Sequence, residues 1–180
     1  TDGTIYSVAA LSASLDLAES YPTKDNTLSS GEIVMLDVAN PMFVSRGIQG
    51  SSMSVMGIVS TNPGFWLGGF NDDMYKNDKK LPIALSGRVP TKVNNEGGVI
   101  EIGDKIALSS TAGVGKKATS TDYTVGTALE SMNNEQGTIE VFVNLDNPVK
   151  SKDVVALESR VLALELNLAN TALTISTSTD

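Results

Sequence analysis

Histidine and cysteine are absent from all 180 residues of the chain. Without imidazole or thiol side chains there can be no Ser–His–Asp or Cys–His triad, no histidine- or cysteine-ligated metal, and no disulfide. Catalysis would have to use carboxylates, hydroxyls or lysines. We therefore expect no cofactor and no enzymatic turnover of a substrate.

Basic residues are also few, since 13 Lys and Arg stand against 21 Asp and Glu and give a formal net charge of −8. An acidic chain without a basic stripe repels phosphate backbones, so we expect no nucleic-acid partner. The most apolar stretch, residues 154–175, includes Glu158, Arg160 and Glu165. These charges argue against a membrane span. Because the chain begins with Thr1 rather than Met, we expect a processed or excised piece of a longer polypeptide.

Residues 28–147 are dominated by short runs rich in Val, Ile and Thr, separated by Gly, Asn, Asp and Pro. This pattern predicts a mainly β domain, a barrel or sandwich of short strands. Pro82 and Pro90 fall inside the longest run and indicate bends or edge positions there. The expected strands are residues 32–38, 42–46, 54–60, 65–67, 81–93, 99–102, 105–108, 123–129 and 138–145.

A short internal repeat lies within this domain. The sequence GEIVML (31–36) resembles GDKIAL (103–108), and each is followed by a Val- and Gly-containing strand, VMGIV (55–59) or VGTAL (125–129). The repeat indicates a duplication in which two β units pack together and protect each other's strand edges.

Residues 148–180 have helical periodicity and predict a separate oligomerising helix with a Ser/Thr-rich tail. Arg160 and Glu165 occupy g and e positions, the offset of an interchain ion pair in a parallel coiled coil. We expect a homo-oligomeric bundle, most simply a trimer. A helix folded onto its own β domain, or packed on another protein, remains an alternative. The apolar a and d positions are Val154, Leu157, Val161, Leu164, Leu168 and Ile175.

Residues 1–27 are rich in Ser, Thr and Ala and are expected to form an N-terminal extension. Its small, mildly apolar residues 4–11 fit a strand exchanged with a neighbouring copy, an edge strand of the same chain, or a frayed end.

Two loops contain residue types that bind ligands in other proteins. Phe65 and Trp66 lie among glycines, which favours packing or a subunit contact, with glycan binding as the alternative. Asp72, Asp73 and Asp78 could offer oxygen ligands to Ca²⁺, but their spacing does not match an EF-hand loop, so a polar loop is favoured.

Four segments in order, with one Val–Gly pair after them, resemble the peptidase G2-like family, the intramolecular-chaperone domains of phage neck appendages and large bacterial surface proteins. The matching segments are DLAESYP (16–22), MGIVSTNPGF (56–65), IALSGRVPTKV (83–93), IGDKI (102–106) and Val125–Gly126. The resemblance implies an extracellular, β-rich, oligomeric appendage protein. In phage members such a domain helps a fibre to trimerise and then cuts itself away through acidic residues, which Asp16 and Glu19 match.

The chain departs from that pattern after the acidic motif, where the aromatic-rich continuation is reduced to Tyr21 and Pro22. The departure favours turn or capping roles for Asp16 and Glu19. Our leading hypothesis is therefore a structural subunit of an extracellular fibre, filament or cell-surface assembly. The alternatives are a self-cleaving chaperone of a phage fibre and a carbohydrate-binding adhesin.

Overall fold

The computed structural model describes residues 15–50, 55–68, 77–119, 122–144 and 160–168. The chain separates into two compact units, residues 1–147 and residues 148–180. The first is a β domain, and the second contains a helix at residues 160–168. No helix within the described ranges has the length and apolar character needed to cross a membrane.

The described residues of the β domain form ten strands in one branched sheet, which confirms the mainly β prediction. The strands are β1 (Leu15–Thr23), β2 (Ile33–Leu36), β3 (Val44–Arg46), β4 (Val55–Val59), β5 (Phe65–Leu67), β6 (Lys79–Asn94), β7 (Lys105–Leu108), β8 (Gly115–Lys117), β9 (Thr124–Ala128) and β10 (Gln136–Asn144).

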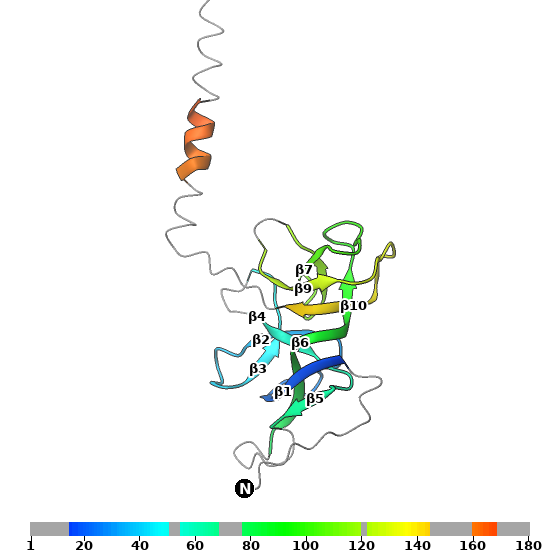
Figure 1. Ribbon diagram of the computed structural model, residues 1–180. Helices are drawn as coiled ribbons and strands as arrows, with labels where there is room; N and C mark the ends of the chain where they lie inside the picture. The colour runs from blue at the N-terminus through cyan, green and yellow to red at the C-terminus, as the bar shows by residue number, and fades with distance from the viewer. Residues whose placement is uncertain (1–14, 51–54, 69–76, 120–121, 145–159, 169–180) are drawn as a thin grey trace, which may run out of the picture. The chain divides into compact units, whose positions relative to one another are not determined.

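Strand β6 organises the sheet because its 16 residues pair with four other strands. Its first part pairs with β1 and β4, and its last part pairs with β10 and β8. Figure 1 shows β6 running from the region of β1 to β5 into that of β7 to β10. The bends predicted from Pro82 and Pro90 fit a strand that changes partners along its length.

The second half of the domain is a closed five-stranded barrel. The pairings run from β6 to β10, β9, β7 and β8 and then return to β6, so none of these five strands leaves the ring open. Closure removes the exposed sheet edges that promote aggregation. The buried apolar residues that belong to the same core cluster include Val89, Val93, Ile100, Ile106, Val125, Ala128, Ile139, Val141 and Val143.

The first half repeats this arrangement. Its strands are paired in the order β1, β6, β4, β2 and β3. The last strand, β3, lies in contact with the first, β1, without pairing with it. Each strand has a counterpart in the barrel: β1 matches β6, β2 matches β7, β3 matches β8, β4 matches β9, and β6 matches β10. A second buried cluster fills this half, formed by Leu28, Val34, Val44, Val59 and Ile83. We call the two halves the first and second repeat.

The repeats share the same local irregularity. The pairing of β2 with β4 shifts register just after Val34, which lies opposite Gly57. The pairing of β7 with β9 shifts just after Ile106, which lies opposite Gly126. A β-bulge that recurs at equivalent glycines supports the predicted duplication.

Backbone hydrogen bonds repeat as well. The Gly31 N–H donates to the Val59 carbonyl at 2.8 Å, and the Gly103 N–H donates to the Ala128 carbonyl at 2.9 Å. These bonds attach the turn before β2 to the end of β4, and the turn before β7 to the end of β9. The Gly–Glu pair at residues 31–32 and the Gly–Asp pair at residues 103–104 therefore occupy the same place in the two repeats.

The acidic residue of each motif is paired with a basic residue. Glu32 lies 3.0 Å from the Arg46 guanidinium, and Asp104 lies 2.8 Å from the Lys117 ammonium group. Burial would raise the pKa of Glu32, but hydrogen bonds from the Ser29 N–H, Lys92 and Arg46 hold it below its usual range. The pKa of Asp104 is lowered chiefly by its hydrogen bond with Lys117.

Three segments differ from the sequence expectations. Residues 99–102 form no strand and contribute one isolated bridge, between Ile100 and Met132. Strand β8 was not predicted, because its sequence is short and rich in Gly and Lys. Strand β1 lies within the segment assigned to an N-terminal extension, yet it pairs with β6 along its whole length.

The recurring bulges make a direct prediction about stability. A methyl group added at Gly126 would overlap the backbone carbonyl oxygen of Phe142, which cannot move without breaking the sheet. We expect Gly126→Ala to lower the free energy of unfolding by about 1–3 kcal/mol, measured by chemical denaturation. In the control Gly137→Ala, the added methyl meets only the flexible Met132 side chain, so the loss should be smaller. Equal losses in both variants would contradict this account of the bulge.

Candidate functional site

A pocket of about 370 Å³ lies where β6 passes from the first repeat to the second. Strands β1, β6 and β10 and the segment after β4 contribute to its wall. The lining residues are Leu15, Asp16, Ser60, Thr61, Asn62, Arg88, Val89, Pro90 and Glu140.

Asp16 is the most unusual residue of this pocket. It is 6% exposed, and its Oδ2 atom is buried without a hydrogen-bond partner among the described residues. Burial raises the pKa of Asp16, and hydrogen bonds from Ser60 and Gly64 offset only part of that rise. A buried carboxylate oxygen without a hydrogen-bond partner is costly, and the same burial is the main cause of the raised pKa of Asp16.

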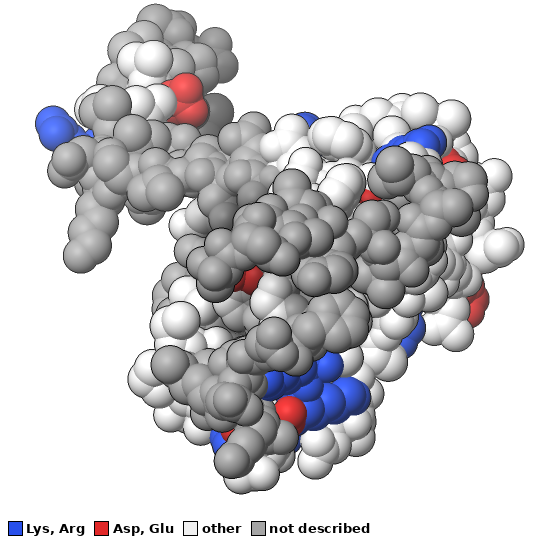
Figure 2. Space-filling view, turned by 60° about the horizontal axis from the view of Figure 1, so that its bottom comes forward, with Lys and Arg blue, Asp and Glu red and all other residues white. Residues whose placement is uncertain are grey.

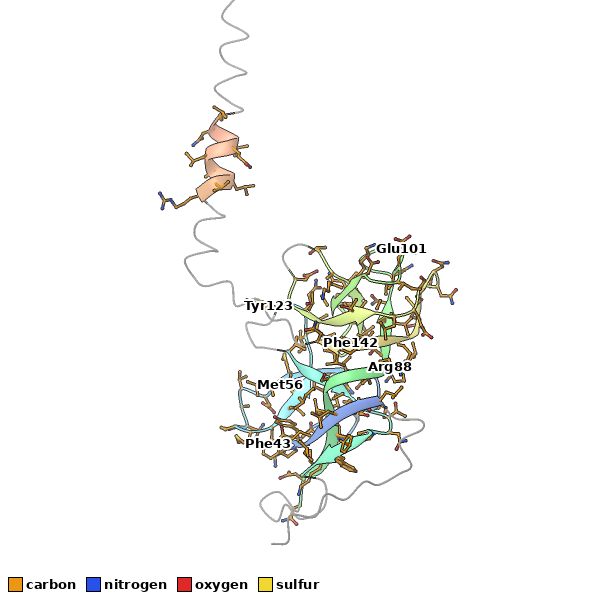
Figure 3. The ribbon with its side chains drawn as sticks, viewed as in Figure 1. Phe43, Met56, Arg88, Glu101, Tyr123 and Phe142 are labelled. Atoms are coloured by element: carbon orange, nitrogen blue, oxygen red, sulfur yellow. The ribbon has the colours of Figure 1, made fainter. Side chains whose placement is uncertain are left out.

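Glu140 supplies a second carboxyl group from β10. Burial raises its pKa, and the negative charges of Glu130 and Asp16 raise it further, while Arg88 acts in the opposite direction. Arg88 and Phe142 face each other in the pairing of β6 with β10, and Figure 3 shows both beside this junction. The pocket therefore combines two partly desolvated carboxyl groups with one guanidinium group.

The predicted pair of acidic residues is not brought together here. Asp16 lines the pocket, but Glu19 does not, and its carboxylate instead accepts a hydrogen bond of 2.9 Å from the Tyr21 hydroxyl. The second carboxylate of the pocket is Glu140, which sequence reasoning missed. Arg88 and Ser60 were also missed, because they join Asp16 only through long-range strand pairing and no local motif marks them.

The predicted calcium ligands are partly outside the described residues. Asp72 and Asp73 fall there, and Asp78 forms an ion pair of 2.6 Å with Lys24. Across the described ranges, no group of three or more acidic side chains is arranged to hold a metal ion.

The aromatic residues of the predicted loop form strand β5. It pairs in parallel with β1, with Leu17 opposite Phe65 and Ala18 opposite Trp66. Phe65 is 44% exposed, whereas Trp66 is half-buried. Among the described strands β5 has β1 as its single partner, so Phe65 lies at an edge of the sheet.

Part of the segment predicted to oligomerise is helical, at residues 160–168, and every residue of this helix is exposed. Figure 2 shows this segment as mainly uncharged surface with one basic and one acidic group, which are Arg160 and Glu165. Val154, Leu157 and Ile175, together with the N-terminal strand expected at residues 4–11, lie outside the described residues. Within the helix, the exposed large apolar side chains are Val161, Leu162, Leu164, Leu166 and Leu168.

Among known proteins, one solved structure supports this fold, with a TM-score of 0.50. No protein-family model and no curated protein matches the chain. One similar structure is the C-terminal fragment of bacteriophage phi29 gene product 12, 15% identical, covering 72% of this chain and 100% of that one, with a TM-score of 0.49. Another is the pre-mature phi29 gene product 12, 14% identical, covering 80% of this chain and 23% of that one, with a TM-score of 0.50. The chain thus has the fold of one part of a longer phage protein.

The buried Asp16 carboxyl predicts a pH-dependent effect of its replacement. The pKa of Asp16 is higher in the folded chain than in the unfolded chain. The wild type therefore loses stability as the pH rises from the unfolded-state pKa to the folded-state pKa. Asp16→Asn removes this loss. We expect the unfolding free energy of the variant, relative to wild type, to be higher at about pH 7 than at about pH 3. Denaturation at both pH values measures the difference, and an unchanged or reversed difference would show that burial does not disfavour ionisation of Asp16.

Proposed function

We propose that the chain is a self-associating structural subunit of an extracellular or virion appendage, held together through its C-terminal helix. The observation that carries this proposal is the exposure of Val161, Leu162, Leu164, Leu166 and Leu168, which ranges from 46% to 73% within a nine-residue helical segment. A helix that is apolar over most of its circumference is normally buried.

The apolar side chains of the helix need a protein partner. Fully burying one Leu or Val side chain contributes about 1.5–3 kcal/mol, so five on one short segment are a strong drive towards association. A second copy of the chain brings the same stripe and the same spacing. Copies of the helix can therefore cover each other along Val161, Leu164 and Leu168, the a and d positions of the heptad pattern.

The two charged residues of the segment support a parallel arrangement. Arg160 and Glu165 are five residues apart, which is the g-to-e′ spacing of an interchain ion pair in parallel coiled coils. Leu162 and Leu166 lie outside the a and d stripe. A bundle of three helices covers more of the helix circumference than a pair does, so we favour a trimer.

The fold supports an appendage setting. The chain shares its fold with part of the pre-mature gene product 12 of a bacteriophage. The matching segments from Asp16 to Gly126 also resemble, in order and spacing, domains of phage neck appendages and bacterial surface proteins. An extracellular or virion location follows from this proposal.

Replacement of one helix residue tests the assembly. Leu164→Asp places a charge in the proposed helix interface, whereas Ala163→Asp places the same charge on the exposed c position of the heptad. We expect light scattering after size-exclusion chromatography to show a trimer for wild type and for Ala163→Asp, and mainly monomer for Leu164→Asp. Circular dichroism should show the same β-sheet signal in all three proteins. A wild-type monomer at high micromolar concentration would end the proposal.

One observation favours a second candidate, self-cleavage of a phage-fibre chaperone. Asp16 matches an acidic residue of that family and is a buried carboxyl with a raised pKa, a property common among catalytic acids. Glu140 rather than Glu19 shares the pocket with it.

Mass spectrometry of a longer precursor decides between the two candidates. Self-cleavage requires two fragments from the wild-type precursor and an intact chain in Asp16→Asn, with Glu19→Gln cut normally because Glu19 lies outside the pocket. If the wild-type precursor stays intact over days, the self-cleavage candidate is removed and the structural role stands.

A further inference from the structure

We propose that an apolar sheet face around Leu17 and Phe142 is an interface with a second copy of this chain, so that the β domains of an assembly contact each other as well as the helices. The inference rests on the proposed self-association, because it adds a second contact to the same assembly. We call this surface the apolar face. Its members are Leu15, Leu17, Phe65, Leu67 and Phe142, whose exposed fractions lie between 40% and 53%.

Strand pairing places these side chains on one side of β5, β1, β6 and β10. Leu17 lies opposite Phe65, and the second apolar residue of β5 follows two positions further along that strand. Leu15 and Phe142 both lie opposite Arg88 of β6, and Figure 3 shows Arg88 next to Phe142. Paired residues share a side of the sheet, and every second residue of a strand returns to that side. The five side chains therefore form one surface, in which Arg88 separates Leu15 from Phe142.

The same side of the sheet is polar further along β6 and β10. Beyond Arg88 it carries Lys92 opposite Thr138 and Asn94 opposite Gln136. Polar side chains of this kind are usual where an antiparallel sheet faces water. Large apolar side chains are therefore not the general character of this side of the sheet, and their concentration at one end is typical of an interaction surface.

The amount of apolar surface fits one side of a protein interface. A large side chain has about 200 Å² of surface, so five side chains that are about half exposed present roughly 450 Å². A standard interface covers about 800 Å² on each partner, of which roughly 450–520 Å² is apolar. The apolar face thus supplies the apolar part of a stable contact.

The path of the chain favours a second copy as the occupant. Strand β10 ends beside the apolar face, because Asn144 lies opposite Ser86, which lies opposite Leu17 on the other side of β6. Fifteen residues, 145–159, connect Asn144 to the helix, and a chain of that length spans at most about 50 Å. Helices that associate therefore keep the β domains of their copies within reach of each other. A short tether raises the effective concentration to about the millimolar range, at which a weak contact forms.

The charges beside the apolar face also suit a second copy. Arg88 is exposed, and Glu140 lies two residues before Phe142 on the same side of β10. Arg88 and Glu140 are near enough for their charges to interact within one chain. A second copy brings its own Arg88 and its own Glu140, so each charge can meet the opposite charge across the contact.

Cysteine protection tests whether a second copy covers the apolar face. The chain contains no cysteine, so a single introduced thiol reports on one position. Leu17→Cys places the thiol on the apolar face. The control Ile102→Cys places it at an exposed residue next to Glu101, which Figure 3 shows well away from Phe142. Each change is made in the full wild-type chain and in the Leu164→Asp chain, and alkylation by iodoacetamide at one pH is followed by mass spectrometry.

We expect the thiol of Leu17→Cys to react at least about tenfold more slowly in the oligomer than in the Leu164→Asp monomer, because a second copy excludes the reagent. Ile102→Cys should react at the same rate in both. In the otherwise wild-type chain, Phe142→Asp should weaken self-association about tenfold or more in sedimentation equilibrium, and Ile102→Asp should leave it unchanged. Circular dichroism checks that each variant keeps its fold.

Equal alkylation rates of Leu17→Cys in the oligomer and the monomer overturn the inference. If both rates are slow, a segment of the same chain covers the apolar face, and if both are fast, the face is open to a different molecule. Unchanged self-association of Phe142→Asp also overturns it. Light scattering on the same samples separates this inference from the proposed assembly. An oligomer with an accessible apolar face ends this inference alone, whereas a wild-type monomer ends both.

Discussion

The hydrogen bonding of β6 is the constraint on which the rest of the β domain depends. One half of this strand closes the barrel with β10 and β8, and the other half carries β1 and β4. Every other strand reaches its place through a ladder that leads back to β6. Two buried apolar clusters pack on this common strand, and the larger one combines residues of both repeats, such as Ile58 with Val141. The two repeats therefore share one strand and part of one core.

The pocket is a product of this sharing. Where β6 changes partners, β1 and β10 both approach it, and Leu15 and Phe142 both lie opposite Arg88. The segment that follows β4 covers the same region and buries the Asp16 carboxyl. A regular ladder would exclude such a group, because an unpaired carboxylate oxygen is expensive inside a sheet. Asp16 thus lies at the junction of the repeats, where β1 and β10 both pair with β6.

Much of the fold could be predicted from local pattern. Short β-branched runs predicted eight of the ten strands, and GEIVML and GDKIAL indicated a duplication that the recurring bulges support. The segment that forms β1 was overlooked because its alternation is weak, and β8 because Gly-Lys-Lys has low strand propensity. Both are held by their partners rather than by intrinsic preference. The pocket could not be predicted for the same reason, since Asp16, Arg88 and Glu140 meet only through pairings between distant strands.

The shared strand also governs how this domain tolerates change. Because side chains alternate from face to face, inserting one residue in β6 would invert the pattern beyond the insertion and expose the core of one repeat. The turns between β2 and β3, or between β7 and β8, can lengthen without such damage, since each affects a single hairpin. We therefore expect changes of length to be tolerated in the loops of either repeat but not along β6, the strand that joins the two repeats.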